Sequence, residues 1–154
     1  MKKLLYDTKE KFMFCRFQAE KRTELLEKMS DVLIAERYVK DSYKEAVILR
    51  EKEFPTGLPT KGISVAIPHT ESQHVIHEGF LVGIVETPVI FEVMASPGEE
   101  VPVEIIFMLA IKEPENQLVM LQKLIGLCQN ERALAMIKEG KEVESINQLL
   151  REII

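Results

Sequence analysis

One histidine in this sequence stands where a side chain could carry out chemistry. His69 directly follows Pro68 at the end of the apolar run "GISVAIPH". Proline fixes its own φ and disfavours the α region for the preceding residue, so the chain leaves this run extended and presents His69 in a defined direction. A ring nitrogen that is largely neutral near pH 7 can act as nucleophile or base. Spacing alone leaves two interpretations open, a catalytic histidine and a loop histidine without function.

No motif for another kind of catalysis competes with this histidine. The sequence contains no G-x-S-x-G, no G-x-x-x-x-G-K-[ST] and no G-x-G-x-x-G. A histidine without a classical triad favours the relay of a group such as phosphoryl, which needs in-line positioning and a cation. Arg50 precedes the turn "PTGLPTKG" and is the candidate cation because its planar fork matches phosphate. An ordinary solvated arginine at a helix end is the open alternative.

The other residues that could bind metal do not form a known ligand pattern. His74 and His77 follow His69 closely, but H-x4-H-x2-H matches no zinc geometry, and solvated loop histidines are the simpler interpretation. Cys15 and Cys128 are far apart and lack CxxC spacing, so neither a disulfide framework nor a zinc site is predicted. We therefore expect no metal and no cofactor. Cys128 falls on the apolar face of a predicted helix, which indicates a buried thiol.

Length and composition predict one domain over residues 1–154. The chain has 154 residues, of which 46% are hydrophobic and 29% charged, enough for a full core. A formal net charge of −5 argues against nucleic acid as a partner and favours a protein with a basic face. The longest apolar run, 103–111, is far shorter than the roughly 20 residues that cross a bilayer, and no signal-peptide pattern opens the chain. We expect a soluble cytoplasmic protein without membrane insertion.

The periodicity of apolar residues predicts the elements that position His69 and Arg50. Apolar residues at helical spacing predict five helices, over 19–36, 41–51, 114–128, 130–140 and 141–154. Runs rich in β-branched and aromatic residues predict five strands, over 11–17, 63–67, 80–86, 89–94 and 101–111. Helices at both ends of a strand-rich middle can cover both faces of one sheet. The expected fold class is α/β, a three-layer arrangement with a mixed sheet of about five strands flanked by helices on both faces.

Two stretches together carry a family resemblance. "AVILREKEFPTGLPTKGISVAIPH", followed after further strands by "EIIFMLAIKEPENQLVMLQKLIGLC", resembles the IIA component of the bacterial phosphoenolpyruvate-dependent sugar phosphotransferase system, in its fructose and mannitol superfamily. The resemblance covers nearly the whole chain. It implies that His69 is phosphorylated and that Arg50 helps to hold the phosphoryl group. For Thr56 and Gly57, turn geometry and proximity to the site stay equally open.

The resemblance also implies a reaction and partners. The histidine-containing phosphocarrier protein HPr would donate its phosphoryl group to His69, with Nε2 as the accepting atom. The protein would act as a phosphotransferase component by passing the group to a cysteine of a cognate IIB component. That IIB component would serve a membrane IIC permease, which moves the sugar as it is phosphorylated.

One residue departs from the mannitol and fructose pattern. Those members typically carry a second active-site histidine before a leucine of the first C-terminal helix, and here Gln117 precedes Leu118. Glutamine can donate an N–H to a phosphoryl oxygen but carries no charge. This favours the galactitol-like branch and a polyol such as galactitol. Two alternatives remain, a regulatory nitrogen-related IIA protein and a non-catalytic ligand or metal-binding module. Whether His74 touches the phosphoryl group depends on the fold of residues 70–79.

Overall fold

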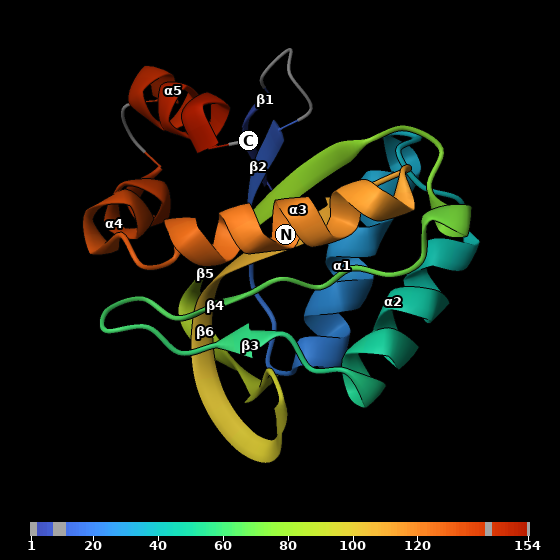
Figure 1. Ribbon diagram of the computed structural model, residues 1–154, viewed down its shortest axis with the longest axis horizontal. Helices are drawn as coiled ribbons and strands as arrows, with labels where there is room; N and C mark the ends of the chain where they lie inside the picture. The colour runs from blue at the N-terminus through green and yellow to red at the C-terminus, as the bar shows by residue number, and fades with distance from the viewer. Residues whose placement is uncertain (1–2, 8–11, 141–142, 154) are drawn as a thin grey trace.

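The computed structural model describes residues 3–7, 12–140 and 143–153, and its elements are drawn in Figure 1. The strands are β1 (Lys3–Asp7), β2 (Phe12–Phe17), β3 (Gly57–Leu58), β4 (Val65–Ala66), β5 (Gly79–Val93) and β6 (Ser96–Ala110). The helices are α1 (Arg22–Ala35), α2 (Ser42–Glu53), α3 (Pro114–Leu127), α4 (Glu131–Glu139) and α5 (Val143–Ile153), with a short 3-10 turn η1 (Ser72–His74). Residues 11, 141, 142 and 154 of the predicted elements lie outside the described residues.

Within the described residues, the strands form one mixed, six-stranded sheet in the order β1-β2-β5-β3-β4-β6, with β5 also paired to β6. The strands β2 and β5 are parallel, as are β4 and β6, whereas β5 and β6 form a long antiparallel hairpin. The short strand β3 pairs antiparallel with β4 and meets the end of β5 at Val93. Through β3, the segment that follows α2 is therefore held beside the strand that leads to His69.

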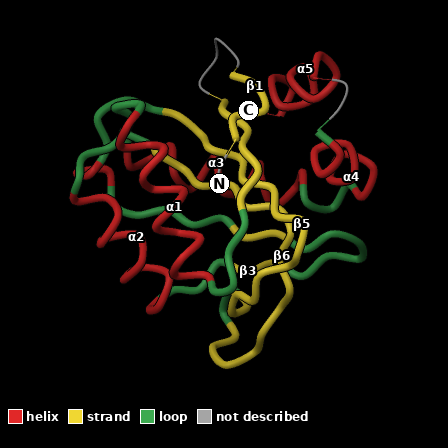
Figure 2. Tube along the Cα trace, turned by 180° about the vertical axis from the view of Figure 1, so that it is seen from behind, coloured by secondary structure: helices red, strands yellow, loops and turns green. Residues whose placement is uncertain are grey.

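Helices cover both faces of this sheet, as Figure 2 shows with α1 and α2 on one side of the strands and α4 and α5 on the other. Alternate residues of β2 point to the two layers: Met13 and Cys15 pack with α1 and α2, whereas Phe12 and Phe14 pack with α3, α4 and α5. The predicted three-layer α/β class is confirmed. The expectation of a buried Cys128 is also confirmed, since only 1% of this residue is exposed.

Individual strands differ from those predicted. The predicted strands 80–86 and 89–94 are one strand, β5, because a register shift between Ile84 and Val89 accommodates Pro88 without ending the strand. Residues 96–100 were expected in a connection but belong to β6, where Ser96 and Glu100 pair with β5 on either side of a register shift, since the hairpin turns within two residues, with Ala95 at a φ of 62°. The strands β1 and β3 were not predicted, and the expected strand 63–67 pairs only over Val65–Ala66.

The helices agree more closely with the predictions. All five are present, and α2 ends at Glu53, ahead of Pro55. At the start of α4, the Asn130 side chain accepts a hydrogen bond from the Ala133 amide, and Gly140 ends the helix in the left-handed region with a φ of 68°. No helix within the described ranges is long and apolar enough to span a bilayer.

Candidate active site

His69 lies just beyond the end of β4, at a position that backbone contacts fix firmly. The Leu109 amide donates to the Pro68 carbonyl at 3.1 Å, which ties this segment to β6. Nδ1 of His69 lies 2.8 Å from the Ile67 carbonyl oxygen. Because a carbonyl can only accept, this contact requires the proton on Nδ1. Nε2 is then the ring nitrogen with a lone pair, the form that a nucleophile needs.

The surroundings of His69 favour its neutral ring. Burial lowers the pKa of His69 below its ordinary value of 6.5, and the positive charge of Arg50 lowers this pKa further. The hydrogen bond to the Ile67 carbonyl acts in the opposite direction. Since the lowering contributions prevail, the imidazole is neutral at pH 7 and its lone pair is available.

The predicted cation, Arg50, lies close enough to His69 for its charge to act on the ring. Arg50 sits in the last turn of α2, where its Cζ lies 4.5 Å from the centroid of the Phe54 ring. A guanidinium over an aromatic face gains a cation–π attraction, and a cation near a helix C-terminus is favourable. The structure thus brings together the two residues that were predicted to act on a phosphoryl group.

Thr56 connects α2 to the segment between β4 and His69. Its amide donates to Glu51 Oε2 at 2.7 Å, and its hydroxyl donates to Glu51 Oε1 at 2.8 Å. The Ile67 amide in turn donates to the Thr56 hydroxyl oxygen at 3.1 Å. Thr56 and Glu51 are both buried, at 4% exposure each. Of the two interpretations of Thr56, its contacts favour a part in the architecture of the site over turn geometry alone.

Glu51 was not predicted to belong to the site. Burial raises the pKa of its carboxyl to about 7, against the opposing hydrogen bonds from Thr56. The sequence carries one signal for it, since the residue directly follows Arg50 and precedes the P-T-G turn. The periodicity of apolar residues does not distinguish this glutamate from others, because a glutamate near a helix end is usually solvated.

Gly57 is closely packed against the neighbouring strands. A Cβ on this residue would lie 2.5 Å from the Glu92 carbonyl oxygen and 2.8 Å from a methyl group of Val101. The strands β3 and β5 can therefore approach only with glycine at this position.

Gln117 reaches the segment after His69 from the first turn of α3. Its Nε2 donates to the Thr70 carbonyl at 3.0 Å. This bond connects α3 to the residue that directly follows His69, so Gln117 lies near the candidate nucleophile, as predicted for a donor to a phosphoryl group.

The other two histidines do not join this group. Nδ1 of His74 lies 2.8 Å from the Ser42 hydroxyl, at the first residue of α2. Arg50 lies about 12 Å further along that helix, from its rise per residue. His77 is exposed, and its amide donates to the Tyr38 carbonyl. In the part of the chain that the structure describes, no three His, Cys, Asp or Glu side chains are grouped to hold a metal ion.

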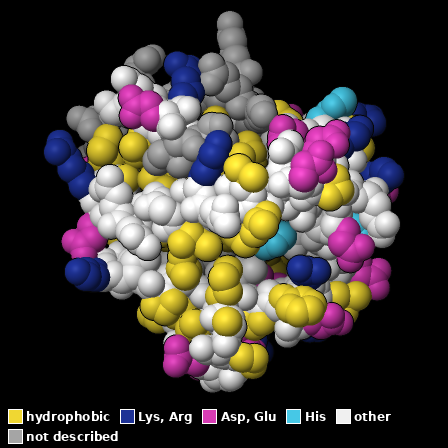
Figure 3. Space-filling model, viewed as in Figure 1, with side chains coloured by type: hydrophobic (Ala, Val, Ile, Leu, Met, Phe, Trp, Pro, Cys, Tyr) yellow, Lys and Arg dark blue, Asp and Glu magenta, His cyan; other side chains and the backbone are white. Residues whose placement is uncertain are grey.

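Exposed apolar side chains lie on the same helix ends as Arg50 and Gln117. Phe54 is 56% exposed beside Arg50, and Leu118 is 62% exposed beside Gln117. Figure 3 shows hydrophobic side chains gathered on this face, with a histidine among them. Apolar surface that surrounds polar groups is typical of a face that docks a protein.

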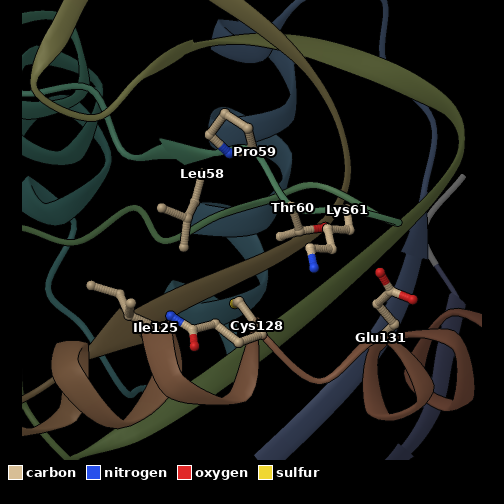
Figure 4. A pocket seen from close by; sticks show the side chains of 8 residues that line it. Leu58, Pro59, Thr60, Lys61, Ile125, Cys128 and Glu131 are labelled. Atoms are coloured by element: carbon tan, nitrogen blue, oxygen red, sulfur yellow. The ribbon is translucent and has the colours of Figure 1, made fainter.

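A pocket of about 580 Å³ lies apart from these residues. It is formed by the loop that begins at Leu58 and by the C-terminal end of α3 with Ile125 and Cys128, as Figure 4 shows. None of its lining residues is among the predicted site residues. The candidate nucleophile therefore does not open into this pocket.

Comparisons with known proteins agree with this arrangement. The family model described as phosphoenolpyruvate-dependent sugar phosphotransferase system, EIIA 2, matches residues 8–153. The galactitol-specific EIIA component of Escherichia coli strain K12 is 32% identical over 108 residues, which cover 70% of this chain and 71% of that protein. The resemblance seen in the sequence is confirmed, including its similarity to a galactitol-specific protein.

Solved structures share the fold. The mannitol enzyme IIA of Escherichia coli, in its complex with phosphorylated mannitol enzyme IIB, matches with a TM-score of 0.73 at 20% identity, over 96% of this chain and 98% of that chain. The nitrogen regulatory protein IIA-Ntr of Neisseria meningitidis matches with a TM-score of 0.64 at 23% identity, over 88% of this chain and 92% of that chain.

Proposed function

Because this chain belongs to the EIIA 2 family of the phosphoenolpyruvate-dependent sugar phosphotransferase system, we propose that it is a phosphocarrier whose acceptor is His69. The observation that carries this proposal is the contact between His69 Nδ1 and the Ile67 carbonyl, beside the charge of Arg50. Together they leave Nε2 unprotonated and put a cation near the ring. In this proposal residues 1–154 act as a single domain and need no cofactor.

The proposed transfer exchanges one phosphorus bond for another in each step. The Nε2 lone pair of His69 forms a P–N bond while the P–N bond of phospho-HPr breaks and its electron pair returns to the donor ring. Arg50 and the amide of Gln117 stabilise the negative phosphoryl oxygens. In the second step a cysteine thiolate of a IIB component forms an S–P bond, and the bond to Nε2 breaks. The proton on Nδ1 stays in place throughout.

The proposed partners are proteins, and the surface beside His69 supports them. Exposed Phe54 and Leu118 provide apolar contact area around the polar centre, as transient protein interfaces require. We propose HPr as donor and a IIB component as acceptor, acting in the cytoplasm for a membrane IIC permease. The similarity to a galactitol-specific EIIA component supports a polyol such as galactitol as the transported sugar.

A regulatory role is a second candidate, since the fold is also that of a nitrogen regulatory IIA protein. Such a protein would accept the phosphoryl group and signal by its phosphorylation state. The two roles differ in whether the group leaves His69 for a IIB cysteine. Incubation of the phosphorylated protein with galactitol IIB separates them, because only the carrier role predicts rapid loss of phosphate from His69.

The first experiment measures intact mass after incubation with phosphoenolpyruvate, enzyme I and HPr. We expect a gain of one acid-labile phosphate in the wild type and in His77→Ala, and no gain in His69→Ala. His77 is the matched control because it is an exposed histidine of the same region. An unphosphorylated wild type would refute the relay and leave the non-catalytic binding module as the function to test.

A further inference from the structure

We propose that Glu51 is a positioning residue, which sets the orientation of His69 through the Thr56 hydroxyl and the Ile67 peptide groups. This inference rests on the proposed phosphocarrier function. It adds a residue that touches neither His69 nor a phosphoryl group but determines how His69 is presented.

A continuous series of hydrogen bonds connects the two residues. The Glu51 carboxyl accepts both the amide and the hydroxyl of Thr56, at 2.7 and 2.8 Å. The Thr56 hydroxyl oxygen accepts the Ile67 amide at 3.1 Å, and the Ile67 carbonyl accepts Nδ1–H of His69 at 2.8 Å. Each member thus fixes the next, from α2 to the imidazole.

Thr56 is well suited to transmit position in this series. A hydroxyl that donates to a carboxyl has a defined direction, so its lone pairs also point in a defined direction. The bonds are buried, where an unmade hydrogen bond costs free energy, so the series stays closed. The Ile67 amide is therefore held at a fixed place relative to α2.

Ile67 needs this external support. The following residue is Pro68, which has no N–H and whose φ is fixed by its ring. The orientation of the Ile67 carbonyl then depends on the peptide before it, whose N–H the Thr56 hydroxyl holds. Because that carbonyl selects the protonated nitrogen of His69, Thr56 and Glu51 influence which nitrogen can accept phosphoryl.

The same series fixes the distance between nucleophile and cation. Arg50 and Glu51 are neighbours on the last turns of α2, so anchoring Glu51 to the β4 segment also anchors Arg50 relative to His69. The charged groups near Glu51 are Arg22 and Glu92. These two pair with each other at 3.0 Å, which leaves the Glu51 carboxyl to Thr56.

The test compares four variants by two independent measurements. Thr56→Val breaks the series, and Glu51→Gln replaces one of its two acceptor oxygens with an NH2 donor, both with little change of shape, whereas Thr56→Ser keeps the hydroxyl. Thr60→Val is the matched control, because the Thr60 hydroxyl bonds only the backbone of its own loop among its described contacts. The tautomer of His69 is read from ¹⁵N shifts of histidine-labelled protein, which has only three histidines. The rate of phosphorylation is measured with saturating phospho-HPr.

We expect Nδ1–H in the wild type, Thr56→Ser and Thr60→Val, with similar rates for all three. In Glu51→Gln and Thr56→Val the Nε2–H tautomer should gain population, and the rate should fall about tenfold, as displaced reacting groups cause. Folded variants with unchanged tautomer and rate would overturn the proposal. A wild type with Nε2–H would overturn it even where a variant does not fold. An unphosphorylated wild type with the expected tautomers would refute the phosphocarrier function but support the positioning.

Discussion

The buried carboxyl of Glu51 predicts a specific dependence of stability on pH. Burial raises its pKa from the ordinary 4.5 to about 7. Between these values the folded protein keeps a proton that the unfolded chain releases, so the free energy of unfolding falls as the pH rises. A tenfold change in proton affinity corresponds to about 1.4 kcal/mol, which gives a total of about 3 kcal/mol for Glu51.

His69 contributes with the opposite sign and must be separated from this effect. Its pKa in the folded protein is lowered, mainly by burial, so the unfolded chain binds the proton more tightly. Its contribution to the free energy of unfolding therefore rises as the pH increases toward 6.5 and is lost as the pH falls. A fall in the free energy of unfolding as the pH rises therefore cannot come from His69, and its absence in a Glu51→Gln variant would assign it to Glu51.

The assay is urea unfolding followed by far-UV circular dichroism, since the chain has no tryptophan. From about pH 5 to about pH 8, we expect the wild type to lose about 2 to 3 kcal/mol relative to Glu51→Gln. Glu53→Gln is the matched control, because it removes the same charge from an exposed residue of the same helix and should keep the slope of the wild type. A difference between wild type and Glu51→Gln that does not change with pH would refute the reasoning. It would mean that the hydrogen bonds from Thr56 balance or outweigh burial.

Three further predictions concern single residues of the site and its scaffold. Arg50→Ala should slow phosphorylation of His69 by about tenfold or more with an unchanged circular dichroism spectrum, since the cation acts on phosphoryl charge; a wild-type rate would contradict its role. Gln117→Leu should slow the transfer less than Arg50→Ala does, because it removes a neutral donor, and rates from the same assay rank the two. Gly57→Ala should destabilise the fold by about 2 kcal/mol in thermal unfolding because its Cβ would meet the Glu92 carbonyl, whereas Gly126→Ala, with no atom within 4 Å, should be neutral or stabilising.

The residues of the site differ in how well the sequence predicts them. The geometry behind Pro68 predicts how His69 is presented, because that geometry is set by the chain itself. It leaves a catalytic and a functionless loop histidine open, and the family resemblance favours the catalytic one. Arg50 follows from its position before the turn, although only the fold brings its charge to the ring. Glu51 could not be predicted in the same way, since it is buried and bonded to Thr56 only in the folded protein. The periodicity of apolar residues gives no information on either feature.

The helices and strands also differ in how well the sequence predicts them, because helices depend on local signals and short strands depend on distant partners. The helices are marked by apolar periodicity and by caps such as Asn130, which are local signals. In contrast, β3 consists of Gly57 and Leu58 and exists only because β4 and the end of β5 lie beside it. In the sequence, Pro88 predicts the end of a strand. In the structure β5 continues past Pro88, since β6 pairs with it on both sides of this residue. Pairing with neighbouring strands therefore determines the existence of β3 and the length of β5.

The charge of Arg50 would act on His69 both before and after the proposed phosphoryl transfer, and both effects favour the transfer. Before transfer it disfavours the protonated imidazole, which has no lone pair to attack phosphorus. In the proposed phosphorylated state the ring would carry a negatively charged phosphoryl group, and the same charge would stabilise it. A neutral donor such as Gln117 can contribute only to the second effect. The placement of a permanent cation beside a half-buried histidine would therefore serve both the empty and the loaded state of the proposed carrier, which explains why arginine rather than a second titrating group suits this position.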